Sequence, residues 1–275
     1  MREKGRREPK VLTPSTQPLP HLSPPRPSAP RRHRPHLQQR RAGRQVQASK
    51  ARQITFGLAE SADYRAVNIE RDGVHGTRFS LRGPMGELSV TLRLAGDQHV
   101  SNALASLAVA IELGVDPAEA ANAVARVAPG TGRGSVSARP RAGHVVDDSY
   151  NANPASVLAA LETLQRAGVG GRRVAALGDM LELGTEEVRL HKEIGERASE
   201  LKLDLLVGAG ALMANAVEAA QLAGVQAHST PDSEAAGRLL HTLLEPGDVL
   251  LLKGSRGMRM ERVLDSLRSG PEGNQ

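Results

Sequence analysis

The sequence has its densest group of chemically capable side chains at residues 147–154, which read Asp-Asp-Ser-Tyr-Asn-Ala-Asn-Pro. This segment follows the apolar pair Val145 and Val146 and precedes a pattern with helical spacing, so we expect a turn from a strand to a helix. In an open α/β sheet such a turn faces a helix N-terminus and binds ligands. A helix cap accounts for Asn153 and Pro154 alone. It leaves unexplained four polar side chains that favour a ligand-binding turn: Asp147, Asp148, Tyr150 and Asn151.

A second candidate turn follows the apolar residues 250–252. Lys253 and Arg256 supply positive charge there, Ser255 supplies a hydroxyl, and two glycines let backbone amides approach a ligand. Such a turn suits a phosphate or a carboxylate, although a tight strand-to-helix turn with solvated arginines has the same spacing. It is not a Walker loop, because Gly-x-x-x-x-Gly-Lys-Ser/Thr occurs nowhere in the chain.

A third segment, residues 178–184, also follows an apolar strand pattern. Asp179 or Glu182 could order a neighbouring loop, contact a cation or cap the helix that begins near Thr185, and a structural use is favoured. His191 lies in that helix, where we expect a helix-face histidine rather than a catalyst.

Strand and helix patterns alternate after a glycine-rich stretch at residues 130–143, which suggests a domain boundary. We expect strands at residues 144–147, 173–177, 204–207, 225–228 and 248–253, and helices at 154–167, 186–201, 212–223, 233–244 and 260–267. This order predicts an α/β fold with a mostly parallel sheet covered on both faces. Because parallel strands end at one edge, the three polar turns should gather there.

The chain before this boundary shows a different pattern. Alternating residues at 77–81 and 88–94, separated by Gly-Pro-Met-Gly, predict a hairpin. Apolar residues from Val100 to Ile111 follow with helical spacing, and Asp116-Pro117 opens a second helix that runs to about Val127.

The first fifty residues differ in composition from the rest. They carry 13 Lys/Arg against 2 Asp/Glu, a net of +11, whereas the other 225 residues carry 23 against 28, a net of −5. Nine of the 17 prolines also lie there, so we expect a disordered tail. The tail has no aromatic residue to stack on a base, and we therefore expect no nucleic-acid partner. The absence of cysteine fits a reducing cytoplasm, and no apolar run approaches the ~18 residues of a membrane span.

The three polar segments, in this order and at these separations, resemble the carboxy-terminal half of a Mur ligase. Asp-Ser-Tyr-Asn-Ala-Asn-Pro with Lys-Gly-Ser-Arg resembles the member that joins D-alanyl-D-alanine to UDP-N-acetylmuramoyl-tripeptide, the last cytoplasmic amide-forming step of peptidoglycan precursor synthesis. The resemblance divides the chain into the tail (1–51), a part of the central ATPase domain (52–130) and a Rossmann-like carboxy-terminal domain (131–275).

The resemblance implies an ATP-dependent ligase, and we expect a monomer. In this family ATP and the tripeptide carboxylate form an acyl phosphate, which the dipeptide amine attacks to give amide and phosphate. Mg²⁺ and cationic side chains stabilise the phosphoryl transfer. The implied cofactors are ATP and Mg²⁺, and the implied partners are UDP-N-acetylmuramoyl-tripeptide and D-alanyl-D-alanine.

Carried over position by position, the resemblance assigns catalytic roles to Lys253 and Asp148. It assigns substrate or nucleotide binding to six further residues: Asn102, Arg133, Tyr150, Asn151, Ser255 and Arg256. Residues 96–102 resemble the family element Gly-x-His-Asn-x-x-Asn, in which Asn102 fits while Gln98 and His99 replace the histidine and the first asparagine. No residue of this chain is assigned to a metal.

The family's phosphate loop, its Mg²⁺-binding glutamate and histidine, and its modified lysine all precede the position that corresponds to residue 52. We therefore expect an incomplete copy with impaired or no turnover, from a truncated or misread gene whose first fifty residues are not family sequence. Three alternatives stay open: a non-catalytic nucleotide- or peptide-binding module, a nucleic-acid-associated protein that acts through the tail, and a sister ligase that adds a different amino acid.

Overall fold

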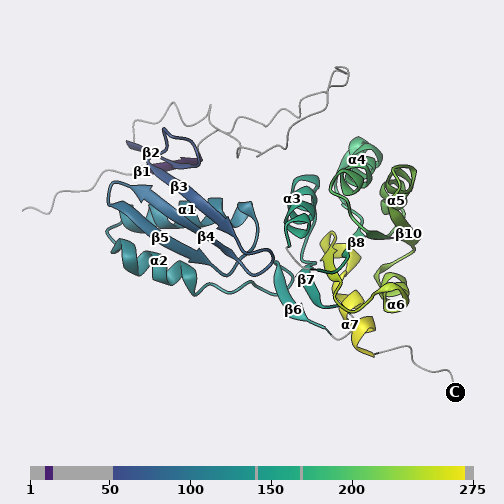
Figure 1. Cartoon of the computed structure of the whole chain (residues 1–275). Helices are drawn as coiled ribbons and strands as arrows, with labels where there is room; N and C mark the ends of the chain where they lie inside the picture. The colour runs from purple at the N-terminus through teal and green to yellow at the C-terminus, as the bar shows by residue number, and fades with distance from the viewer. Residues whose placement is uncertain (1–9, 15–51, 140–141, 168–169, 270–275) are drawn as a thin grey trace, which may run out of the picture. The chain divides into compact units, whose positions relative to one another are not determined.

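The computed structural model describes residues 10–14, 52–139, 142–167 and 170–269, which divide into two compact units (Figure 1). The first unit contains the described chain up to Ile69, together with Phe79–Val90 and Val100–Val124. The second contains Glu70–Arg78, Thr91–His99 and the described chain from Ala125 onward. Each sheet of the fold belongs mainly to one unit.

The first unit is built on a five-stranded sheet in the order β1-β2-β3-β4-β5. The strands are β1 (Lys10–Pro14), β2 (Arg52–Gly57), β3 (Tyr64–Arg71), β4 (Thr77–Gly83) and β5 (Gly86–Leu92), followed by α1 (Asp97–Glu112) and α2 (Pro117–Ala125). β4 and β5 are hydrogen-bonded neighbours joined by two residues, which only an antiparallel pair allows, so the predicted hairpin is confirmed. Both predicted helices are confirmed as well, and the apolar stripe of α1 is buried at Val100, Leu104 and Leu107.

One strand of this sheet, β1, lies among the residues for which the composition predicts a disordered tail. It pairs in parallel with β2, with Leu12 opposite Ile54. Val11 and Thr13 favour extended chain, and β2 offers an edge whose backbone groups need partners. The prediction is therefore wrong for these five residues, and the other residues of the tail lie outside the described part of the chain.

The second unit is built on a six-stranded sheet in the order β10-β9-β8-β11-β7-β6. Its strands are β6 (Ser135–Ala138), β7 (His144–Asp148), β8 (Arg173–Gly178), β9 (Leu205–Ala209), β10 (Gln226–Thr230) and β11 (Val249–Lys253). β6 pairs antiparallel with β7, and all other pairs are parallel. The predicted α/β class and mostly parallel sheet are confirmed. β6 escapes prediction because it is a four-residue edge strand with little apolar character.

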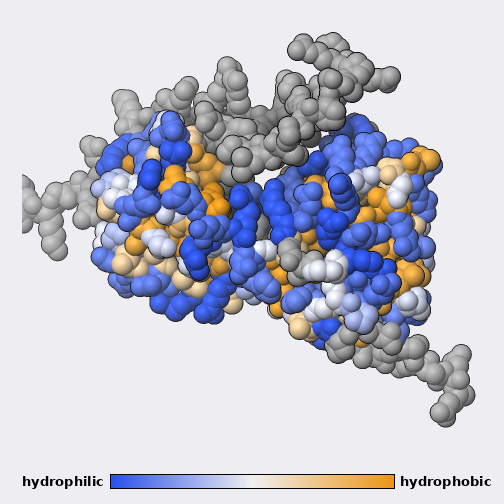
Figure 2. Space-filling view, viewed as in Figure 1, coloured by the Kyte–Doolittle hydropathy of each residue, from blue (hydrophilic) through white to orange (hydrophobic). Residues whose placement is uncertain are grey.

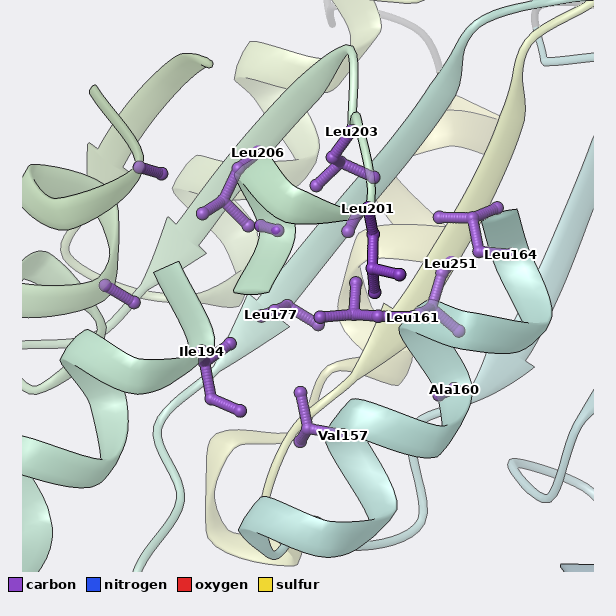
Figure 3. Close-up of a cluster of buried hydrophobic side chains, with 14 of the residues drawn as sticks. Val157, Ala160, Leu161, Leu164, Leu177, Ile194, Leu201, Leu203, Leu206 and Leu251 are labelled. Atoms are coloured by element: carbon purple, nitrogen blue, oxygen red, sulfur yellow. The ribbon is translucent and has the colours of Figure 1, made fainter. Parts of the chain in front are cut away.

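Five helices cover the two faces of this sheet: α3 (Pro154–Gln165), α4 (Glu187–Glu200), α5 (Met213–Leu222), α6 (Ser233–Leu243) and α7 (Glu261–Ser269). Figure 3 shows side chains of α3 and α4 meeting residues of the central strands, among them Leu161, Ile194 and Leu251. Leu250 and Leu252 of β11 pack with α6 and α7 in a second core on the other face of the sheet. Because side chains alternate between faces, β11 is apolar on both, as expected of a buried parallel strand.

The order of strands brings β7, β11 and β8 side by side, and their carboxyl ends share one edge of the sheet. Lys253, the last residue of β11, lies in register with Asp148 of β7 on one side and with Leu177 of β8 on the other. The three turns that follow these strands are the three polar segments of the sequence. Their predicted gathering at one edge is confirmed.

Figure 2 shows hydrophilic residues across the visible face of both units, interrupted by smaller hydrophobic patches. None of the helices among the described residues is long and apolar enough to cross a membrane.

Close packing of α4 on α5 makes a first prediction. A Cβ on Gly195 of α4 would lie 2.0 Å from the carbonyl oxygen of Ala216 in α5, so Gly195→Ala forces the helices apart. We expect the variant to lose about 1 to 3 kcal/mol of unfolding free energy in chemical denaturation. Gly170→Ala, where a Cβ meets open space, is the matched control and should change stability by less than about 0.5 kcal/mol. Equal effects of the two substitutions would contradict the packing.

Candidate active site

The side chain of Lys253 is the centre of the polar edge. Its ammonium donates to Asp148 Oδ2 at 2.6 Å and to the backbone carbonyl of Asn151 at 2.9 Å. The side chain of Lys253 is only 4% exposed, whereas that of Asp148 is 26% exposed. A charge this deeply buried must be paired and hydrogen-bonded, and both partners come from the 147–154 segment. The pair therefore ties the end of β11 to the turn after β7.

Other residues of the 147–154 segment stabilise the turn and the helix that follows it. Asp147 Oδ1 accepts from the backbone N–H of Ser149 at 3.2 Å and from its hydroxyl at 2.5 Å, which closes the turn. Asn153 caps α3 in a capping box with Ser156, and Pro154 follows at the first helical position. The cap thus accounts for Asn153 and Pro154, as the sequence predicts.

Ser255 joins all three segments. Its hydroxyl oxygen accepts from the backbone N–H of Leu181 at 2.9 Å, and its own N–H donates to the carbonyl of Asp179 at 3.1 Å. The hydroxyl also donates to the carbonyl of Ala152 at 3.4 Å. Ser255 is 5% exposed, so these contacts use a hydroxyl for which the sequence predicts a ligand. Its contact with substrate stays a prediction.

Asp179 caps a helix, but not the one that the sequence predicts. Its carboxylate accepts from the backbone N–H of Met213, the first residue of α5, at 2.7 Å. A Cβ on Gly210 would lie 2.4 Å from this carboxylate, so the glycine lets the loop after β9 wrap around it. Glu182 is exposed, with a φ of 63°.

Two arginines present positive charge to solvent at this edge. The Arg133 guanidinium lies over the ring of Tyr150, 3.8 Å from its centroid, in a cation–π contact. The Tyr150 N–H donates to the carbonyl of Gly132 at 2.9 Å, which holds the ring beneath the guanidinium. Arg256 is 65% exposed on its side chain and pairs with Glu261 at 2.9 Å.

Two further predicted residues lie apart from these contacts. The side chain of Asn151 is exposed and only its carbonyl meets Lys253. Asn102 is exposed on α1 in the first unit, where its carbonyl accepts from Ser106 at 3.0 Å. The structure thus brings together Lys253, Asp148, Asn151 and Ser255, and it pairs Arg133 with Tyr150. Nucleotide or substrate binding by any of them stays a prediction.

His99 and Asp148 face a small cavity of about 30 Å³, also lined by Thr163, which has room for a water molecule. Burial raises the pKa of the Asp148 carboxyl, although the charge of Lys253 opposes the shift. Burial lowers the pKa of His99 from 6.5, and the Asp148 carboxylate acts against that shift. The lowered pKa favours the neutral form of the His99 imidazole.

The implied Mg²⁺ finds no ligand set in the part of the chain that the structure describes. No group of three or more His, Cys, Asp or Glu side chains there could hold a metal ion. The carboxylates of the site are already engaged: Asp148 with the Lys253 ammonium, Asp147 with Ser149 and Asp179 with the Met213 N–H. These residues do not fit the ion.

The buried pair makes a second prediction. Lys253→Met leaves the Asp148 carboxylate without its cation, and we expect a loss of about 2 to 3 kcal/mol of unfolding free energy. The double variant Lys253→Met with Asp148→Leu should be more stable than the sum of the single changes by about 1 kcal/mol or more. Urea denaturation of the four proteins measures this coupling. Strict additivity would show that the contact contributes nothing.

The cavity makes a third prediction, about pH. NMR titration should give His99 a pKa below 6.5, and Asp148→Asn should lower it further, because the carboxylate that favours the imidazolium is gone. Since the pKa is lower in the folded state than in the unfolded state, His99 makes the protein less stable as pH falls through about 6.5 and then through the folded value. A higher pKa of His99 in the variant would contradict the geometry.

Domain models of one family match most of the sequence. The Mur ligase middle domain matches residues 37–110, and the Mur ligase glutamate ligase domain matches residues 132–256. The first match begins within the tail that the composition sets apart, so residues 37–51 resemble the family after all.

Two curated relatives share a name. The UDP-N-acetylmuramoyl-tripeptide–D-alanyl-D-alanine ligase of Escherichia coli is 34% identical over 213 residues, 76% of this chain and 45% of that protein. The protein of the same name in Mycobacterium tuberculosis (strain H37Rv) is 32% identical over 238 residues, 79% of this chain and 47% of the relative. The chain thus spans about half the length of the curated relatives it matches.

Solved structures agree with these matches. A crystal structure of MurF from Acinetobacter baumannii has a TM-score of 0.71 and 29% identity, covering 80% of this chain and 48% of that one. MurF ligase from Thermotoga maritima in complex with ADP has a TM-score of 0.63 and 27% identity, covering 78% and 48%. With two domain models in sequence order, relatives of one name and three family segments joined at one sheet edge, the chain belongs to the Mur ligase family.

Proposed function

We propose that this protein acts in the ATP-dependent ligation of D-alanyl-D-alanine to UDP-N-acetylmuramoyl-tripeptide. The observation that carries the proposal is the joining of the three family segments by Lys253 and Ser255. The curated relatives bear the name of this ligase, which supports the choice of substrates. A cytoplasmic location belongs to the same proposal, because ATP and the nucleotide-linked precursor are cytoplasmic molecules.

The proposed contribution of this chain is to bind and orient substrates. Arg133 and Arg256 are exposed at the edge of the sheet and suit an anionic group, such as a substrate carboxylate. The Tyr150 ring restricts Arg133 to one side of the turn. The buried pair of Lys253 and Asp148 holds the turn in place, so that little ordering is left for the moment of reaction.

ATP supplies, when bound, the phosphoryl group that activates the tripeptide carboxylate. The sequence contains no Walker loop, and the described residues contain no metal-ligand group. The described residues do not fit the triphosphate. We also infer that residues 52–130 and 131–275 correspond to the middle and carboxy-terminal domains of the family, in line with the two domain matches.

Measurement of ADP release tests the proposal and gives a fourth prediction. The purified chain is mixed with ATP, Mg²⁺, the UDP-linked tripeptide and D-alanyl-D-alanine. Release should be slow, because the sequence contains no Walker loop, and it should require both substrates. Lys253→Ala should reduce the rate roughly 100-fold, because the turn that orients the substrates is displaced. Lys192→Ala, an exposed lysine of α4, should leave it unchanged. A folded wild-type protein with no substrate-dependent release would overturn the proposal for this chain.

A further inference from the structure

His191 is a fully buried histidine in α4, with 0% of its surface exposed. Its Nε2 lies 3.0 Å from the backbone nitrogen of Met180, and its Nδ1 lies 2.7 Å from the carbonyl oxygen of Glu187. The Met180 N–H is a donor, so Nε2 must accept. Nδ1 then carries the proton and donates to Glu187. The contacts assign one neutral tautomer.

Met180, whose N–H donates to His191, lies between two residues that contact Ser255. Asp179, before Met180, accepts from the N–H of Ser255 at 3.1 Å. Leu181, after it, donates to the hydroxyl of Ser255 at 2.9 Å. The imidazole therefore fixes the middle of a three-residue stretch whose two ends clasp Ser255.

The loop needs an acceptor at this point because its backbone leaves regular structure. β8 ends at Gly178, and Glu182 and Gly184 adopt left-handed conformations with φ of 63° and 59°. Met180 is only 1% exposed, so its N–H is buried and needs a partner within the protein. A side-chain acceptor from α4 satisfies the amide.

Ser255 in turn connects the 178–184 loop to the turn that carries Lys253. Ser255 lies two residues after Lys253, and its hydroxyl also contacts the carbonyl of Ala152, next to the Asn151 carbonyl that accepts from Lys253. A shift of the 178–184 loop would move Ser255 and, through the short turn, the Lys253 ammonium.

We propose that His191 is a positioning residue, which holds the 178–184 loop against Ser255 and thereby fixes the turn that carries Lys253. Because it is fully buried, it would act through the loop and not by contact with a substrate. The effect of His191 on ligation rests on the proposed function, whereas the effect of His191 on the 178–184 loop does not. If His191 only filled space, an apolar ring of similar size could replace it without effect. Substitution therefore distinguishes a packing role from a hydrogen-bonding role.

His191→Phe keeps a ring of similar size and removes the acceptor, and His191→Gln restores an acceptor oxygen. In hydrogen exchange, the amides of Met180 and Leu181 should exchange at least 10-fold faster in the Phe variant, and the Gln variant should recover most of that protection. ¹⁵N NMR of wild-type protein should show the proton of His191 on Nδ1. His241→Phe, which changes another buried histidine on the opposite face of the sheet, is the control and should leave both amides protected.

Where the wild-type chain turns over, kcat should fall about 10-fold in the Phe variant and return in the Gln variant, with little change in the KM for ATP. Unchanged exchange of Met180 and Leu181 in His191→Phe, or a proton on Nε2, would overturn the proposal. If the wild-type chain shows no turnover, the proposed function fails, and the exchange and tautomer measurements still decide the role of His191.

Discussion

The buried ammonium of Lys253 is the constraint on which the edge of the second sheet depends. β11 is apolar until its last residue, and there it places a cation that is almost closed to water. The cation requires an anion and a carbonyl at fixed positions, which are supplied by Asp148 and Asn151. The Asp147 turn and the Asn153 cap hold those two partners in place. Asp148, the Asn151 carbonyl, Asp147 and Asn153 of this segment therefore support either the lysine or the helix beside it.

Much of the second unit could be predicted from sequence because its signals are local. Apolar runs bounded by glycine and acidic residues, alternating with helical periods, place β7 to β11 and α3 to α7 within about two residues. Four strands escaped prediction. β6 is a short polar edge, β1 lies within proline-rich, basic sequence, and β2 and β3 precede the residues in which the alternating pattern was recognised. The hydrogen-bond partners of the site residues could not be predicted from sequence either. No local signal tells that the hydroxyl of Ser255 turns inward or that His191 reaches Met180, since both contacts join residues distant in sequence.

The predicted site residues divide into two kinds once their surroundings are known. Lys253, Asp148 and Ser255 are engaged with the protein, and their charge and hydrogen-bonding capacity are largely used. Arg133 and Arg256 keep their guanidinium groups at the surface. A motif contains both kinds because a binding surface needs buried residues that hold it rigid and exposed residues that can meet a ligand. Two interpretations of the turn after β11 were open, an anion-binding turn and a tight turn with solvated arginines. In the structure, Lys253 and Ser255 of this turn are buried and Arg256 is exposed.

Burial raises the pKa of Asp148 even though Lys253 lies beside it, so desolvation outweighs attraction to the neighbouring charge. Such a pair adds little stability over apolar residues, and its value lies in specificity. β7 and β11 are parallel and apolar on both faces, which specifies their register weakly. A slip by one residue would turn the ammonium to the other face, toward the leucines of α6 and α7. The cost of that unpaired charge selects the register in which Lys253 meets Asp148, and the same register brings the three polar turns together.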